Sequence, residues 1–180
     1  MIFVICLIVR RMTNYYTGVG SRKAPQDILS LMERLAEAYK GMGWILRSGG
    51  AQGSDTAFEK GAGDLKEVYK ANIYKFVSPV IYDRAKNISK NYHGAWMKCS
   101  AYAKALHARN VFQVLGMDLE TPSHFLVCWT PDGCRDHYSR TLETGGTGTS
   151  ISVAWGRGIK VYNLAMCEDR VFFEEYLRSR

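Results

Sequence analysis

Short apolar runs that stop in glycine alternate with segments of helical spacing along most of this chain. The run 124–130 (HFLVCWT) has an unbroken apolar centre, as strands buried on both faces of a parallel sheet do. In 25–41 the apolar residues instead recur every three to four positions, which is the period of an amphipathic helix. Strands that alternate with helices are typical of α/β proteins. The pattern therefore predicts a Rossmann-like three-layer fold with a mostly parallel central sheet flanked by helices.

The same pattern predicts where the elements lie in a single domain, residues 12–180. We expect strands over 14–22, 44–50, 71–79, 124–130 and 159–165, and helices over 25–41, 54–62, 95–115, the part of 143–158 after its glycines, and 168–180. The apolar run 1–11 is interpreted as an N-terminal extension or an extra edge strand without chemistry. Its nine apolar residues are too few to span a bilayer, and it lacks the charge and cleavage pattern of a secretory signal. We therefore expect a cytoplasmic protein without a membrane partner.

The composition is that of a globular domain with a basic balance: 47% hydrophobic, 23% charged and a formal net charge of +7. A basic surface favours anionic partners but does not distinguish nucleic acid from a free nucleotide. The five cysteines show no C-x-x-C spacing, which disfavours a disulfide framework or a zinc ribbon. Cys134 and His137 together provide too few ligands for zinc. We expect neither a metal nor a cofactor.

Three glycine-rich turns stand at strand ends and precede helices: Thr17–Arg22, Ser48–Asp55 and Thr144–Ser150. Glycine lets backbone N–H groups approach an anion closely, and a helix N-terminus adds unpaired donors and the positive end of the dipole. Arg22 and Arg47 add positive charge. Because the carboxyl ends of parallel strands meet at one edge of a sheet, we expect the three turns to form one phosphate pocket.

Two common phosphate-binding motifs do not describe these turns. None of them has the spacing G-x-x-x-x-G-K-[ST] of a nucleoside-triphosphate P-loop. The first turn does not complete G-x-G-x-x-G, because Lys23 stands at the position of the third glycine and Pro25 follows shortly after, which disfavours the ordinary dinucleotide fingerprint.

The segments GVGSR, SGGAQGSDTAFEKGA, ARN and GGTGTSISVAWGRGIKVYNLA resemble the Rossmann-like domain of the DprA/Smf family of DNA-processing proteins. That family belongs to the SLOG group of nucleotide-sensing domains, which also includes the Lonely-guy (LOG) phosphoribohydrolases. The resemblance runs from about Tyr15 to Ala165 and is strongest to compact single-domain DprA-like proteins, often encoded by bacteriophages. It implies a pocket for phosphate groups, those of single-stranded DNA in DprA, and an R-N motif at Arg109 and Asn110.

The turns and the resemblance together predict a site that binds a ligand through its phosphates. Its residues are Gly18, Gly20, Ser21, Arg22, Ser48, Gly49, Gly50, Gly53, Ser54, Asp55, Arg109, Asn110, Gly145, Gly146, Thr147, Gly148 and Thr149. We assign no catalytic residue, because Ser152 replaces the glutamate of the LOG motif P-G-G-x-G-T-x-x-E and Thr144 replaces its proline. A serine cannot act as the carboxylate that such hydrolysis needs, although Glu143 or Asp55 could take that place.

Several other side chains have both a functional and a structural interpretation. Trp129 and Tyr92 could stack on a base, while packing in the core is the structural alternative for Trp129. His93 and His107 could donate to a phosphate or be ordinary surface histidines. Asp55 could accept from a ribose hydroxyl or cap the helix that follows it.

We therefore expect a protein that binds a phosphorylated nucleotide without turning it over, as a sensor or a sequestering protein. The SLOG resemblance implies an ADP-ribose-type or cyclic signalling nucleotide in phage–host defence or counter-defence. Two alternatives stay open: binding of single-stranded DNA as a DprA-like recombination mediator, and a LOG-like nucleotide phosphoribohydrolase activity. The resemblance also implies a homo-oligomer, a dimer or larger.

Overall fold

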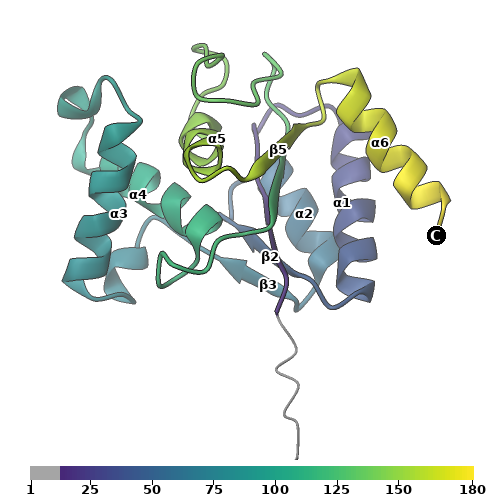
Figure 1. The fold of residues 1–180 in the computed structure, drawn as a ribbon, viewed down its shortest axis with the longest axis horizontal. Helices are drawn as coiled ribbons and strands as arrows, with labels where there is room; N and C mark the ends of the chain where they lie inside the picture. The colour runs from purple at the N-terminus through teal and green to yellow at the C-terminus, as the bar shows by residue number, and fades with distance from the viewer. Residues whose placement is uncertain (1–12) are drawn as a thin grey trace, which may run out of the picture.

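The computed structural model describes residues 13–180 and shows a five-stranded, all-parallel sheet covered by helices on both faces (Figure 1). The prediction of a Rossmann-like three-layer α/β fold is confirmed. The extension or edge strand predicted over residues 1–11 lies outside the described residues.

The strands lie in the order β3-β2-β1-β4-β5. In chain order the elements are β1 (Tyr15–Gly18), α1 (Gln26–Gly41), β2 (Ile45–Ser48), α2 (Ser54–Ala62), β3 (Lys66–Val68), η1 (Ile73–Lys75), α3 (Pro79–Asn91), η2 (Trp96–Lys98), α4 (Ala101–Leu115), β4 (Phe125–Cys128), α5 (Thr147–Gly156), β5 (Lys160–Asn163) and α6 (Cys167–Arg178). The chain builds outward from β1 to β3 and then crosses to β4 on the other side of β1. The direction of winding therefore switches between β1 and β4, the place where open α/β sheets bind ligands.

The helices form one layer on each face of the sheet. In Figure 1, α1, α2 and α6 cover one face, and α3, α4 and α5 cover the other. Each face has its own cluster of buried apolar residues, and β4 contributes to both: Leu126 and Cys128 pack with α4 and α5, while Val127 packs with α1 and α2. Burial on both faces is the reason for the unbroken apolar run in this strand.

The strand predicted over 71–79 is wrong. The third strand lies earlier, at Lys66–Val68, and 71–79 contains η1 and the first residue of α3. Ser78 caps α3 by accepting from the N–H of Ile81 at 3.3 Å, and Pro79 takes the first helical position, where its missing N–H costs nothing. β3 is short, polar and at the edge of the sheet, so its sequence lacks the apolar run from which a buried strand can be predicted.

The helix predicted over 95–115 begins later than expected. α4 starts at Ala101, because Ser100 accepts from the N–H of Ala103 at 3.1 Å and caps the helix there. The segment before it holds η2, and α3, which the sequence analysis did not predict, packs on α4. None of the helices in the described part of the chain has the length and apolar character that crossing a bilayer requires.

Candidate functional site

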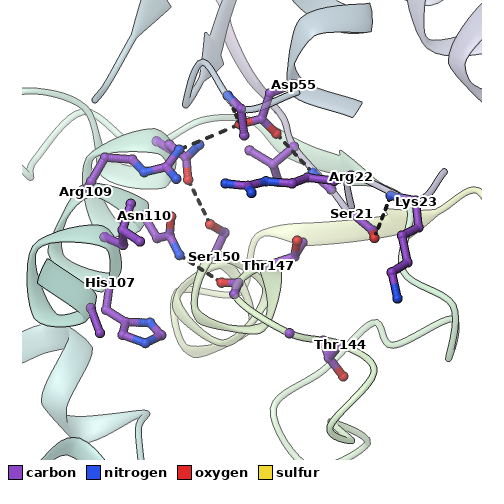
Figure 2. Close-up of a pocket in the computed structure, with 18 of the residues that line it drawn as sticks. Ser21, Arg22, Lys23, Asp55, His107, Arg109, Asn110, Thr144, Thr147 and Ser150 are labelled. Atoms are coloured by element: carbon purple, nitrogen blue, oxygen red, sulfur yellow. Dashed lines mark hydrogen bonds and ion pairs between the residues drawn. The ribbon is translucent and has the colours of Figure 1, made fainter. Parts of the chain in front are cut away.

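A cavity of about 430 Å³ lies beyond the carboxyl end of β1, next to the switch point of the sheet. Four segments enclose it: the turn after β1, the start of α2, one face of α4 and the N-terminal end of α5 (Figure 2). Its volume falls within the range of roughly 300–1,000 Å³ that is typical of small-molecule sites. The fold thus brings four distant parts of the sequence to one place.

The cavity gathers residues from all three glycine-rich turns and from the R-N motif. The predicted site residues that line it are Gly20, Ser21, Arg22, Asp55, Arg109, Asn110, Gly145, Gly146 and Thr147. The others lie behind its wall or elsewhere: Gly18, Ser48, Gly49, Gly50, Gly53, Ser54, Gly148, Thr149, Tyr92 and Trp129. The three turns therefore meet at one cavity, but the second turn contributes only Ala51 and Asp55 to its wall.

Carboxylates of the chain itself occupy the N–H donors of the second turn. The N–H of Gly50 donates to Glu59 Oε1 at 2.9 Å, and that of Ala51 donates to Asp55 Oδ2 at 3.3 Å. These oxygens take the place that a bound phosphate would take in a free anion-binding turn. The second turn supports the cavity wall, and its N–H groups at Gly50 and Ala51 already have acceptors within the chain.

Glycines of the second turn allow close approaches within the protein. A Cβ on Gly49 would stand 1.3 Å from Arg109 Nη1, so glycine alone leaves room for the guanidinium at the end of β2. Gly53 has a φ of +84°, and a Cβ there would lie 2.7 Å from the Cα of Arg22, where the first two turns touch. Ser54 fastens this contact, because its hydroxyl donates to a backbone carbonyl of the first turn at 2.9 Å.

Asp55 joins the first turn, the second turn and α4. Its side chain accepts from the N–H of Gly20 at 3.2 Å and from the N–H of Ala51 at 3.3 Å, and it lies 3.6 Å from Arg109 Nη1. Burial raises the pKa of Asp55 to about 6, although Arg109 and both N–H donors act in the opposite direction. Both carboxylate oxygens of Asp55 thus accept hydrogen bonds inside the protein, and α2 has no side-chain cap.

Gln113 of α4 connects the parts of the wall. With the amide oxygen turned toward β2, that oxygen accepts from Arg109 Nη1 and from the N–H of Gly49, each at 3.0 Å. The amide nitrogen then donates to Asn110 Oδ1 at 3.0 Å and to Ser150 Oγ at 3.1 Å. Every hydrogen-bonding position of the amide is used, which fixes α4 between β2 and α5.

The third turn brings a helix N-terminus to the cavity. Asn110 Nδ2 donates to the carbonyl of Gly146 at 2.8 Å and holds the turn against α4. α5 begins directly afterwards, and Gly145, Gly146 and Thr147 all line the cavity. The first N–H groups of a helix have no acceptor within the helix and carry partial positive charge. Gly146 and Thr147 thus bring the N-terminal end of α5, with its partial positive charge, to the cavity wall.

Arg22 and Lys23 are exposed cations on the cavity wall, and neither makes an ion pair with any residue of 13–180. Figure 2 shows the side chain of Arg22 among those that line the cavity. Arg47, the other cation that the sequence placed in the turns, is only 2% exposed. It pairs with Glu67 at 2.8 Å within the fold and lies outside the cavity.

One part of the wall is apolar. Ala103 and Leu106 of α4 line the cavity and offer a surface for a base or a sugar ring. The aromatic side chains that sequence reasoning selected for stacking lie elsewhere. Trp129 packs against the core on the side of α1 and α6, and Tyr92 lines a second cavity beside Arg140.

Ser152, at the position of the LOG glutamate, does not line the cavity. It is fully buried, and its hydroxyl donates to the carbonyl of Gly148 at 2.8 Å and accepts from Arg140 Nη1 at 3.0 Å. Of the two carboxylates that could replace the missing glutamate, Asp55 is engaged in the wall, and Glu143 lines the cavity with an exposed side chain.

Sequence reasoning left out part of the wall that helical spacing could have found. His107, which it gave only as an alternative, and Gln113 lie three residues before and after Asn110, so one face of α4 presents all three. Leu106 and Ala103 lie on the same face of α4, so helical spacing from Asn110 predicts them as well. Lys23 lies just after the first predicted turn and Ser150 at the end of the third, and their place in the wall becomes visible only when the turns are brought together.

Comparison with known proteins finds no relative of this chain. No protein-family model, no curated protein and no solved structure matches the chain. The candidate site rests on its own geometry: a cavity with a helix N-terminus, two exposed cations, a buried ion pair and an apolar wall.

Proposed function

We propose that this protein binds one phosphorylated nucleotide in the 430 Å³ cavity and holds it without chemical change. The observation that carries the proposal is the convergence of the α5 N-terminus with Arg22 and Lys23 around one cavity. A phosphate beside Gly146 and Thr147 would meet unpaired N–H groups and the positive end of the helix dipole. The apolar surface of α4 would then receive the base or the ribose.

The resemblance to DprA and SLOG domains leads us to propose the class of ligand. It favours an ADP-ribose-type or cyclic signalling nucleotide, sensed or sequestered in phage–host defence or counter-defence by a homo-oligomer of this chain. The division of the cavity into a cationic part and an apolar part supports a ligand that carries both phosphate and ring.

The arrangement of carboxylates around the cavity supports the proposal that the ligand is held unchanged. Hydrolysis of an N-glycosidic bond needs a carboxylate free to stabilise positive charge or to move a proton. Asp55 uses both oxygens within the wall, and Ser152 lies outside the cavity. Glu143 is the carboxylate through which a phosphoribohydrolase activity would have to operate.

Thermal unfolding in the presence of a ligand panel tests the proposal. The panel contains AMP, ADP, ADP-ribose, a cyclic dinucleotide and a single-stranded oligonucleotide. A nucleotide present at 100 times its Kd stabilises the folded state by about 2.7 kcal/mol. For a chain of this length that corresponds to roughly 5–10 °C in Tm. We expect a shift of this size from at least one mononucleotide or ADP-ribose derivative.

Salt and product analysis separate the alternatives. Between 50 and 200 mM salt, a single strand held at 6–10 phosphates loses roughly 300-fold to 10,000-fold in affinity through release of its condensed counterions. A single nucleotide has no such counterion layer, so its affinity should fall far less. Stabilisation by the oligonucleotide alone, with the steep salt dependence, would replace the proposal by single-stranded DNA binding. Release of free base from a nucleoside monophosphate would replace it by hydrolysis, and Glu143→Gln would then abolish the release.

A further inference from the structure

His93, Cys99 and His107 form a cluster beside the cavity. His93 follows α3, Cys99 follows η2, and His107 lies in the middle of α4. One potential ligand atom from each residue lies within 4.8 Å of the other two, and all three side chains are half-buried. The rings of His93 and His107 meet edge to face, with their centroids 4.3 Å apart.

The distance between Cys99 and His93 is close to that in a metal site. Zinc bonds of about 2.3 Å to sulfur and 2.0–2.1 Å to nitrogen, at a tetrahedral angle, place the two donor atoms about 3.6 Å apart. Cys99 Sγ lies 3.8 Å from each ring nitrogen of His93. The observed sulfur–nitrogen distance therefore lies within about 0.2 Å of the distance that a shared zinc ion requires.

The contacts of His107 orient its ring for metal binding. Its Nδ1 lies 2.7 Å from Thr149 Oγ1, which holds the ring and leaves Nε2 free. A partner on the second ring nitrogen is the usual outer contact of a histidine that binds a metal.

We propose that His93, Cys99 and His107 bind a divalent transition-metal ion of the zinc class. Two imidazoles and a thiolate are a ligand set that zinc prefers, and three protein ligands leave a fourth position for water or another ligand. The Cys99 thiolate offsets one of the two positive charges, which matters beside Arg140. His107 also lines the 430 Å³ cavity and His93 lines the neighbouring one, so the ion would stand between them.

Titration of the full-length, reduced protein with Co²⁺ and Zn²⁺ alone tests this site. We expect one ion per chain and a thiolate-to-cobalt charge-transfer band in the near-ultraviolet, which Zn²⁺ abolishes by displacement. Cys99→Ser should remove the band, and His93→Gln should weaken Zn²⁺ binding at least tenfold. Thr149→Val, which removes only the partner of His107, should weaken it about tenfold. Cys167→Ser, at an exposed cysteine outside the cluster, should change nothing.

Alkylation of the wild-type protein provides a measurement that does not depend on any variant folding. Cys99 is half-buried and Cys167 is exposed, so both should react with iodoacetamide in the absence of metal. Zn²⁺ should slow the alkylation of Cys99 at least tenfold and leave that of Cys167 unchanged, as read from the peptide masses. Equal rates at Cys99 with and without Zn²⁺, or Co²⁺ spectra unaffected by Cys99→Ser, would overturn the proposal. Because no nucleotide is present, neither result bears on the nucleotide site.

Discussion

Asp55 and Arg109 form a buried ion pair across the joint between α2 and α4, with 3.6 Å between Oδ2 and Nη1. The two side chains are 4% and 12% exposed, and both residues line the cavity. Arg109 Nε is buried and has no hydrogen-bond partner among residues 13–180. An unpaired buried donor costs about 1–3 kcal/mol, so the wall of this cavity is not optimised for stability alone. We expect this pair to make the stability of the protein depend on pH and on substitution at either residue.

Asp55 should make the stability of the protein fall as the pH rises from about 4 to 6. Its pKa is about 6 in the folded state and near 3.8 otherwise, so the folded chain binds more protons than the unfolded chain in this range. A difference of about two pKa units corresponds to about 3 kcal/mol. The free energy of unfolding of the wild type minus that of Asp55→Asn should therefore decrease by this order of magnitude between pH 4 and pH 7. A constant difference would contradict the account.

His107 titrates with the opposite sign, which is why the comparison with Asp55→Asn is needed. Its pKa is lowered to about 4, so the unfolded chain binds the extra proton and stability rises as the pH increases from about 4 to 6.5. In the wild type the two effects oppose each other. His107→Gln should reveal a steeper loss of stability with rising pH than the wild type shows, as followed by urea unfolding at each pH.

Arg109→Gln should destabilise the protein more at pH 7 than at pH 5. Removing one partner of a buried pair leaves the other charge uncompensated, typically at a cost of about 3–5 kcal/mol. At pH 5 the cost should be smaller, because Asp55 can take up a proton. The double variant Asp55→Asn/Arg109→Gln should recover most of the lost stability at pH 7. A double-mutant cycle measures this coupling, and simple addition of the two single costs would show that the residues act independently.

Gly49→Ala should displace Arg109 and lower stability. A Cβ at this position would overlap Arg109 Nη1, and the side chain would have to leave its place over the end of β2. We expect a loss of about 1–3 kcal/mol, as for overpacking elsewhere. Gly94→Ala is the matched control, because a Cβ there meets nothing within 4 Å. Equal Tm values for the two variants in thermal unfolding would show that Arg109 adapts freely.

Arg22→Gln should lower nucleotide affinity without lowering stability. Arg22 is exposed, lines the cavity and makes no ion pair within the described chain, so its charge is available to a phosphate. Loss of one charge-assisted hydrogen bond costs about 1.5–3 kcal/mol, or roughly 10- to 100-fold in Kd. Calorimetric titration of the best ligand from the panel measures the change. Arg34→Gln, a change of charge on α1 away from the cavity, should leave the Kd unaltered.

Patterns that repeat along the chain predicted most of the fold. β4 was predictable because a strand buried on both faces needs an unbroken apolar run. α1 was predictable because its buried apolar residues recur with the helical period. β3 could not be found in this way, since Lys66 and Glu67 of a short edge strand carry no such pattern. The start of α3 was readable in principle from Ser78 and Pro79, a cap followed by a favoured first residue.

The candidate site was predictable only as far as its turns and the pair Arg109 and Asn110. The glycine-rich turns do meet at the strand ends, as predicted. A glycine there, however, can make room for a contact within the protein as well as for a ligand. At Gly49 it admits the guanidinium of Arg109, and at Gly50 its N–H is taken by Glu59. Sequence cannot tell such internal contacts from contacts with a ligand, because both need a bare backbone. The cluster of His93, Cys99 and His107 was equally hidden, since its spacing matches no motif and packing of α4 beside α3 creates it.

Binding of ADP-ribose to a cavity-filled variant, measured by isothermal titration calorimetry, tests the central claim most directly. Gly146 lines the cavity at the α5 N-terminus, and a Cβ there meets nothing within 4 Å, so Gly146→Leu should fold and occupy the space for phosphate. Gly41→Leu, at an equally open position on α1, is the control. The account predicts one ligand per chain for the wild type and Gly41→Leu and no binding to Gly146→Leu at the same Tm. Undiminished binding to Gly146→Leu would place the ligand elsewhere and contradict the account.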